Sequence, residues 1–196
     1  MSRSKLVEKL EELRSKQKLI DNAWKKTGNK EFLQFLVEIL PKTLNAERCS
    51  IFILDPVNEN VWVQCGTGLS ERQVSVPRDS SLVGKTISTG QYQIETDMDK
   101  HLGAHDTVAI KTGFVTRNAL CVPVQGVTKD RVTGAIQVLN KIGGHTFTDE
   151  DRTILEKLAF HLQMNVENIF IKQELAKISN EMKEQIISLE TKLSDS

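Results

Sequence analysis

The residues of this chain that could do chemistry begin with a polar run in the stretch KTGFVTRN. The run leads directly into the apolar stretch ALCVPV and contains Thr112, Gly113, Thr116, Arg117 and Asn118. Hydroxyl, guanidinium and amide groups beside a buried strand can donate hydrogen bonds to a small molecule. The pattern therefore indicates a polar junction between a loop and the core of a sheet.

Thiol and metal chemistry are poorly supported by the spacing of the other reactive residues. The cysteines Cys49, Cys65 and Cys121 show no CxxC spacing and lie in or beside apolar, strand-like runs. Thiols in such runs usually pack as small hydrophobic groups, so we expect three buried, reduced cysteines. We expect no metal site, because no acid or cysteine combines at ligand spacing with the four histidines. They are His101, His105, His145 and His161.

The charge balance and the distribution of apolar residues exclude several classes of partner. Lysine and arginine number 26, as do aspartate and glutamate, and no block of like charge occurs. We therefore expect neither nucleic acid nor an anionic membrane surface as a partner. No apolar run approaches the roughly 18 residues that span a bilayer, and the first residues lack the apolar core of a signal peptide. A soluble, cytoplasmic protein is expected.

Both ends of the chain have apolar residues at alternating spacings of four and three, which is typical of coiled-coil helices. In residues 1–28 the series is Leu6, Leu10, Leu13, Ile20 and Trp24, with Gln17 at its one polar position, and in residues 171–196 it is Ile171, Leu175, Ile178, Met182, Gln185 and Leu189. We expect a parallel homodimer through these helices, because such weakly apolar helices are rarely stable alone. The alternative is an amphipathic helix that folds back on its own domain.

Residues 29–170 alternate between helical and strand-like patterns. A helix is expected to stop before Pro41 or shortly after it, and RCSIFILD and VWVQCG predict a hairpin. RQVSVP indicates an edge strand, and SSLVGKTISTG a short helix that Ser80 or Ser81 caps and Gly90 ends. Two more strands, NALCVPV and RVTGAIQVLNKI, precede a long helix that Thr146 or Thr148 caps. The order predicts an α+β fold, an antiparallel sheet of about six strands with helices on one face.

With that order in view, residues 31–170 resemble a GAF domain, a small-molecule sensor module. The resemblance is closest to the cyclic-nucleotide-binding type of phosphodiesterases and adenylyl cyclases. It rests on RCSIFILD, on SSLVGKTISTGQ with Gly84 and Gly90, on GAIQVLNK, and on TGFVTRNALCVPV, which is similar to the family run TGF-x-TRN-x-LC-x-P. The resemblance implies a GAF/PAS-like domain over residues 29–170 that is regulatory and not catalytic.

That subtype also has a signature that joins an Asn-Lys pair to a later phenylalanine and an Asp-Glu pair. Asn140, Lys141, Phe147 and Asp151 fit it, whereas Arg152 stands in place of the glutamate. The resemblance implies an ion pair between Lys141 and Asp151 that ties the last strand to the final helix. The alternative is a solvated lysine and an acid that only favours the start of a helix. Arg152 would be free to point to solvent.

The ligand contacts of the family fall on ten positions of this chain. The resemblance implies a pocket whose floor contains Ser50, Cys65 and Gly66. Its roof contains Leu82, Val83, His105, Ala109, Thr112 and Thr116, and Gln137 reaches in from the sheet. In guanine-binding relatives an aspartate reads the base where this chain has Gly66, and a stacking aromatic stands where it has Cys65.

The expected ligand is a small molecule, with a cyclic nucleotide as the first candidate. The N–H groups that begin the helix after Ser81 favour an anion such as a cyclic phosphate. Because this chain has a glycine where guanine-binding relatives have an aspartate, we expect cAMP rather than cGMP. Closure of the loop from Met98 to Gly113 would then shift the C-terminal coiled coil and act on an output partner. The alternatives are another small molecule, a ligand-free dimerisation scaffold and, least supported, a reductase of free methionine sulfoxide that uses the three cysteines.

Overall fold

The computed structural model describes residues 29–55, 60–70, 74–76, 78–98, 113–127 and 131–194. The helices are α2 (Asn29–Thr43), α3 (Leu82–Thr89) and α5 (Asp149–Ser194). The strands are β1 (Ala46–Leu54), β2 (Val61–Gly66), β3 (Ser75–Val76), β4 (Gln93–Glu95), β5 (Ala119–Gln125) and β6 (Val132–Lys141). The predicted coiled-coil segment 1–28 lies outside the described residues.

The six strands form one sheet in the order β3-β2-β1-β6-β5-β4, and every neighbouring pair is antiparallel. The predicted α+β class, the antiparallel sheet and its strand number are confirmed. β4 was not predicted, because its three residues contain a single β-branched side chain and no alternating pattern extends beyond them. Its edge position beside β5 is a consequence of tertiary pairing.

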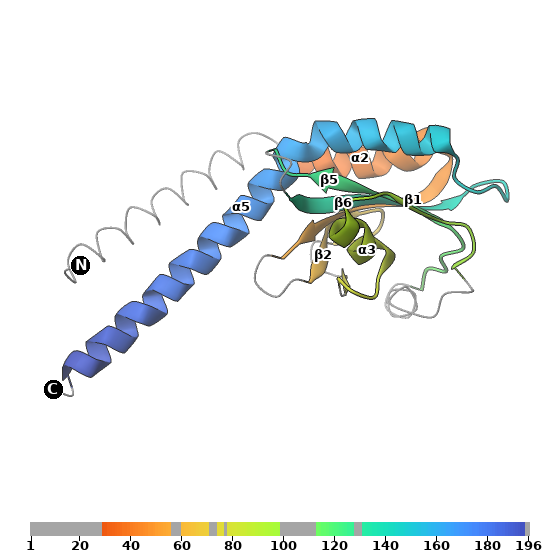
Figure 1. The fold of residues 1–196 in the computed structure, drawn as a ribbon. Helices are drawn as coiled ribbons and strands as arrows, with labels where there is room; N and C mark the ends of the chain where they lie inside the picture. The colour runs from red at the N-terminus through yellow and green to blue at the C-terminus, as the bar shows by residue number, and fades with distance from the viewer. Residues whose placement is uncertain are drawn as a thin grey trace. The chain divides into compact units, whose positions relative to one another are not determined.

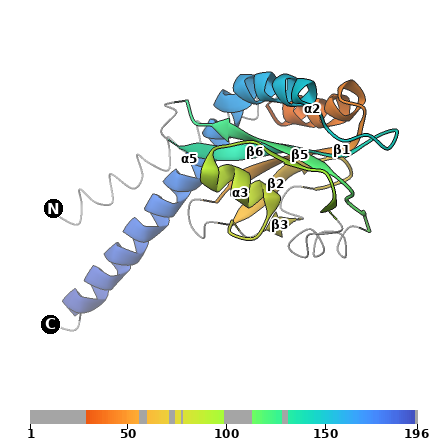
Figure 2. The same cartoon turned by 45° about the vertical axis from the view of Figure 1, so that its right-hand side comes forward.

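Helices cover both faces of the sheet. α2 and the first part of α5 lie side by side on one face, and α3 lies on the opposite face (Figures 1 and 2). The expectation that all helices share one face is therefore wrong for α3. This short helix buries Val83, Thr86 and Ile87, and it contacts β5 and β6. Because α3 has only eight residues, the sequence did not indicate that it forms a layer of its own on the second face of the sheet.

α2 continues through Pro41 and ends two residues later, at Thr43. Of the two predicted endings, the one shortly after Pro41 is therefore correct. Proline has no N–H, so the carbonyl of Val37 one turn earlier lacks its usual helical donor. The Thr67 hydroxyl lies within hydrogen-bond distance of that carbonyl, at 3.3 Å, and also accepts from the Cys49 N–H at 3.1 Å. The proline thus leaves a carbonyl that the turn after β2 uses.

α3 has the two ends that the sequence predicts. The Ser81 side chain caps it by accepting from the Gly84 N–H at 2.9 Å, and Gly90 ends it with a left-handed φ of 65°. Gly84 is required by a close approach, since a Cβ atom there would lie 2.1 Å from the carbonyl oxygen of Arg78. The glycine spacing thus reflects one packing contact and one helix end.

Residues Lys30–Phe170 form one compact unit, and the later part of α5 belongs to a second one. In the first unit, α5 buries Leu155, Leu162 and Val166. Residues 171–194 are helical, as predicted, and their pairing with a second helix stays a prediction. None of the described helices combines the length and the apolar character that a membrane span needs.

Candidate functional site

A cavity of about 80 Å³ lies on the α3 side of the sheet. Side chains from β1, β3, β6, α3 and the segment before β5 line it. The polar ones are Arg48, Ser50, Ser80, Ser81, Thr116 and Gln137. The apolar ones are Phe52, Leu69, Val74, Val76, Leu82, Val83, Met98, Phe114 and Leu139. The wall is therefore mainly apolar, with a few polar groups that could orient a small molecule.

Half of the predicted contact residues come together at this cavity. Ser50, Leu82, Val83, Thr116 and Gln137 all line it. Cys65 and Gly66 are not among the described lining residues, and His105, Ala109 and Thr112 lie outside the described part of the chain.

The register of β1 and β2 explains the position of Cys65. Ser50 pairs with Gly66 and Ile51 pairs with Cys65. Directly paired residues share a face, and successive residues alternate, so Cys65 lies on the α2 and α5 side, away from Ser50. Gly66 faces the side of Ser50, and a Cβ atom on it would lie 2.7 Å from the Ser50 Oγ. A larger residue at position 66 would thus require Ser50 to move.

Sequence reasoning missed Arg48 and Phe114 as lining residues. The Arg48 Cζ lies 3.9 Å from the centroid of the Phe114 ring, a cation–π contact at the cavity. The period of two along β1 contains the signal that could have found Arg48, because a strand that directs Ser50 into a cavity directs Arg48 there too. Phe114 has no such signal, since it precedes β5 in an irregular segment.

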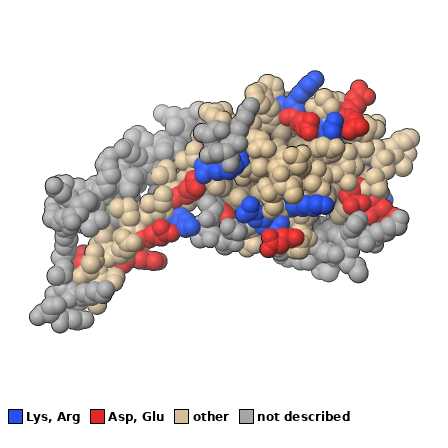
Figure 3. All heavy atoms as spheres, viewed as in Figure 1, with Lys and Arg blue, Asp and Glu red and all other residues tan. Residues whose placement is uncertain are grey.

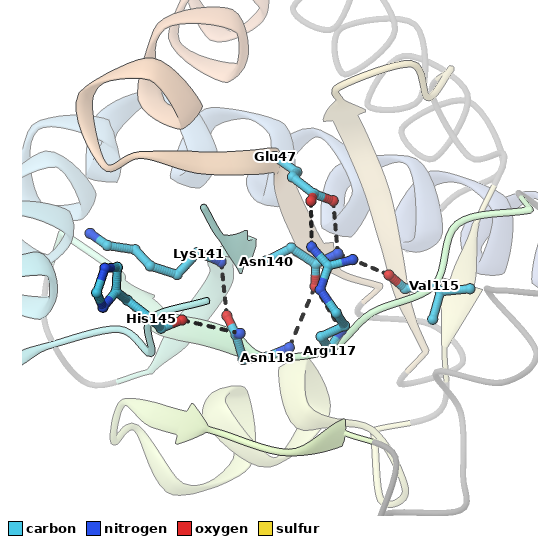
Figure 4. Close-up of polar contacts among 7 residues, drawn as sticks. All are labelled: Glu47, Val115, Arg117, Asn118, Asn140, Lys141 and His145. Atoms are coloured by element: carbon cyan, nitrogen blue, oxygen red, sulfur yellow. Dashed lines mark hydrogen bonds and ion pairs between the residues drawn. The ribbon is translucent and has the colours of Figure 1, made fainter. Parts of the chain in front are cut away.

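A polar network centred on Asn140 holds that irregular segment (Figure 4). The Asn140 side chain is fully buried, and its Oδ1 accepts from the Arg117 N–H at 2.7 Å. Its Nδ2 donates to the Val115 carbonyl and to Glu47 Oε2, both at 2.9 Å. Asn140 has a left-handed φ of 57°, a conformation that asparagine tolerates better than most residues. Its position beside Thr116 makes it a determinant of the cavity wall.

Glu47 extends the network to β1. It forms an ion pair with Arg117 as well as the bond from Asn140. The hydrogen bond from Asn140 is the main reason that the pKa of Glu47 lies below its ordinary value, and Arg117 adds to the effect while burial opposes it. Because the Arg117 side chain is about half exposed, the ion pair alone contributes little stability. The buried amide of Asn140 is the stronger anchor.

Lys141 ties the end of β6 to the start of α5. Its Nζ lies 2.7 Å from Asp151 Oδ1 and donates to the Leu44 carbonyl at 2.8 Å. Asp151 Oδ2 accepts from the Thr148 N–H at 2.9 Å, which caps the helix. Burial alone would raise the pKa of Asp151, but the bonds from Lys141 and Thr148 and the charge of Lys141 outweigh it and lower the pKa. The Lys141 Nζ also lies 5.8 Å from the centroid of the Phe147 ring.

Asn118 links these two groups. Its carbonyl accepts from the Asn140 N–H, and its Oδ1 accepts from the Lys141 N–H, both at 2.9 Å.

Arg152, which was expected to be free to point to solvent, lies instead with its guanidinium 4.5 Å from the centroid of the Tyr92 ring. It also approaches Asp149 at 3.6 Å. The arginine thus has a structural contact next to β4.

The described site is a mainly apolar cavity with a few polar groups. Among the described residues, no cluster of three or more histidine, cysteine or acidic side chains could hold a metal ion. On the face shown in Figure 3, basic and acidic side chains are interspersed, so this face offers no continuous basic surface for a phosphate backbone. A few polar groups around an apolar cavity are suited to recognising a small organic molecule.

Comparison with protein families assigns this fold and site to a known group. The model of the GAF domain matches residues 29–166, which is most of the chain. The chain belongs to the GAF domain family. The family is one of regulatory, small-molecule-binding modules.

Two relatives with GAF domains are phosphodiesterases. One is the "Dual 3',5'-cyclic-AMP and -GMP phosphodiesterase 11A" of Takifugu rubripes, 26% identical over 58% of this chain and 14% of that protein. The other is the "Cone cGMP-specific 3',5'-cyclic phosphodiesterase subunit alpha'" of Mus musculus, 30% identical over 44% of this chain and 10% of that protein. The matches therefore span a small part of each relative.

Solved structures share the GAF fold at lower identity. The GAF domain of a phosphoenolpyruvate-protein phosphotransferase from Coxiella burnetii has a TM-score of 0.62 and 18% identity, over 80% of this chain and 94% of that one. The type II free methionine-R-sulfoxide reductase from Thermoplasma acidophilum has a TM-score of 0.57 and 16% identity, over 72% and 94%. These likenesses show the fold alone.

Replacement of Asn140 by glycine tests the polar network. Glycine keeps the left-handed backbone without strain, so Asn140→Gly removes only the side-chain bonds. We expect the free energy of unfolding to fall by about 2 to 3 kcal/mol, because buried partners are left unsatisfied. The control is Asn45→Gly, at an exposed asparagine whose φ is 52°. Equal effects of the two substitutions in urea denaturation would contradict the role given to the amide.

The Lys141–Asp151 tie is tested by Asp151→Asn and the pH dependence of stability. The folded pKa of Asp151 is lowered, so its contribution is complete above the unfolded value of about 3.9 and is lost as pH falls through the folded value. At neutral pH the substitution should cost about 2 to 3 kcal/mol, and it should flatten the acid side of the stability curve.

Asp149→Asn is the matched control for this substitution. Its carboxylate is 82% exposed in the same helical turn, so little change is expected. Chemical denaturation at a series of pH values measures both variants, and a wild-type acid slope in Asp151→Asn would exclude the tie.

Proposed function

We propose that this domain is a non-catalytic sensor that binds a small molecule in the cavity between the sheet and α3 and passes the signal through paired helices. The observation that carries the proposal is that side chains from five sequence-distant parts converge on one cavity. Among them are Ser50, Thr116 and Gln137, whose neutral donors and acceptors can orient a ligand. Membership of the GAF family supports a regulatory role.

The ligand that we propose first is a cyclic nucleotide, with adenine preferred over guanine. The names of the two relatives state activity on cyclic AMP and cyclic GMP, and the chain is similar to short parts of them. Selective recognition of guanine would use an acid that accepts from the N–H edge of the base, and position 66, where the resemblance places this acid in guanine-binding relatives, is a glycine in this chain. Gln137 offers an amide oxygen that can accept from the exocyclic amine of adenine.

Burial of the cysteines argues against the reductase alternative. All three thiols are buried, and burial raises the pKa of Cys49 and raises that of Cys121 to about 12. A nucleophilic cysteine needs an accessible thiolate, which a buried thiol with a raised pKa does not supply. The likeness to the sulfoxide reductase concerns the fold and does not extend the reaction to this chain.

Signal transmission would use α5, which continues without a break from Asp149 to Ser194. The Lys141–Asp151 ion pair ties the first turn of this helix to β6, and β6 contributes Gln137 to the cavity. In the later part, Ile171, Ile178 and Leu189 of the apolar series are exposed. We propose that these positions pair with a second copy of the chain and that the homodimer controls an output partner. A ligand would act by favouring one of two helix arrangements.

A ligand-free dimerisation scaffold is the second candidate, and the size of the cavity favours it. About 80 Å³ is far below the 300 to 1,000 Å³ of typical ligand pockets, so a nucleotide requires the cavity to enlarge. A scaffold would need no such change. The two functions differ in a simple observable, because only a sensor is stabilised by its ligand.

Thermal unfolding with cyclic AMP, cyclic GMP and a metabolite panel separates the two. A ligand at 100 times its dissociation constant adds about 2.7 kcal/mol to stability, and we expect cyclic AMP to raise the Tm more than cyclic GMP. Thr116→Val should weaken ligand binding about tenfold through the lost hydroxyl. Thr153→Val, at an exposed position of α5, should leave it unchanged. No stabilisation by any compound would favour the scaffold.

A further inference from the structure

Arg48 is the one charged residue among the described residues that line the cavity. It shares a face of β1 with Ser50 and Phe52, and it pairs with Leu139 of β6. Most of the surrounding wall is apolar. A cation beside an apolar cavity is a costly arrangement unless an anion compensates it, which makes the partners of this side chain informative.

Among the described residues, no acid forms an ion pair or a hydrogen bond with this guanidinium, although the charge of Glu47 lies near enough to interact with it. Glu47, the neighbour in sequence, directs its carboxylate to Arg117 and Asn140. The Arg48 guanidinium lies over the Phe114 ring at 3.9 Å instead. An arginine that uses its flat face against a ring keeps N–H donors in the guanidinium plane for a second partner. Arg48 is therefore held in position while its strongest bonding groups remain available to a ligand.

We propose that Arg48 binds the anionic group of the ligand, so that the ligand is a small organic anion whose apolar body lies toward Phe52, Val83 and Leu139. The inference rests on the proposed sensor function and names the class of compound that the site takes. A guanidinium binds carboxylates and phosphates in the same bidentate manner, and the shared chemistry is that of an anion attached to an apolar or planar body. Ser80 and Ser81, which also line the cavity, add neutral hydroxyls to its wall.

This assignment differs from recognition by α3 alone. The Gly84 N–H at the start of α3 already bonds to the Ser81 Oγ at 2.9 Å. The helix thus has one fewer N–H to offer, whereas the guanidinium of Arg48 carries several N–H donors. An anion held by Arg48 would lie against β1 and Phe114, next to the segment that contains Thr116.

The test is calorimetric titration of the full chain with two anions and their neutral counterparts. Cyclic AMP is paired with adenosine, and hexanoate with hexanamide, so that the arms separate a phosphate from a carboxylate. We expect at least one anion to bind, and its neutral counterpart to bind at least about tenfold more weakly, as for loss of a charged hydrogen bond. The comparison is made on the wild-type protein and does not depend on the folding of any variant.

Three variants locate the effect. Arg48→Gln should weaken the anion about tenfold or more and leave the neutral compound unchanged, whereas Arg48→Lys, which keeps the charge, should lose less. Lys85→Gln, at an exposed position of α3, is the control for a general change of charge. If neutral compounds bind as well as the anions, or Arg48→Gln binds anions normally, the inference is overturned while the sensor function stands. If no compound of either charge binds, both are overturned.

Discussion

Asn140 lies at the end of β6 with its side chain fully buried, and a buried amide must bond its polar atoms or destabilise the fold. It satisfies them with the backbone of Val115 and Arg117 and with Glu47 of β1. The irregular segment before β5 forms no helix or strand, so its course depends on individual bonds of this kind. The buried side chain of Asn140 therefore holds part of the cavity wall, and its left-handed backbone turns the chain at the same point.

Lys141, the residue after Asn140, connects the same end of β6 to α5. Asn140 positions the cavity wall, while Lys141 binds Asp151 and the Leu44 carbonyl and so fixes the start of α5. The Arg117 carbonyl also accepts from the Met98 N–H at 2.8 Å, so the same segment holds Met98, another lining residue. Asn140, which holds the segment containing Thr116, and Lys141, which holds α5, are consecutive residues of β6. A ligand that moved Thr116 would thus act close to the start of the final helix.

The sequence predicted the features that local chemistry determines. The apolar runs of β1 and β6, the Ser81 cap and the glycine at the end of α3 each follow from nearby residues, and all appear in the structure. The features that depend on contacts between distant segments were missed. β4 exists because β5 offers a free edge, Arg152 finds Tyr92 across the fold, and Glu47 reaches Asn140 only through strand register. Arg48 was missed although the period of two places it beside Ser50.

Amide hydrogen exchange of the Arg117 N–H tests the central claim, that the buried Asn140 side chain fixes the cavity wall. In the wild-type protein this amide should exchange slowly, because Asn140 Oδ1 is its acceptor at 2.7 Å. In Asn140→Gly it should lose that protection, while the Ile142 amide, which donates to the Asn45 carbonyl at 2.7 Å, should keep it. Rapid exchange at Arg117 in the wild type, or unchanged protection in the variant, would contradict the account.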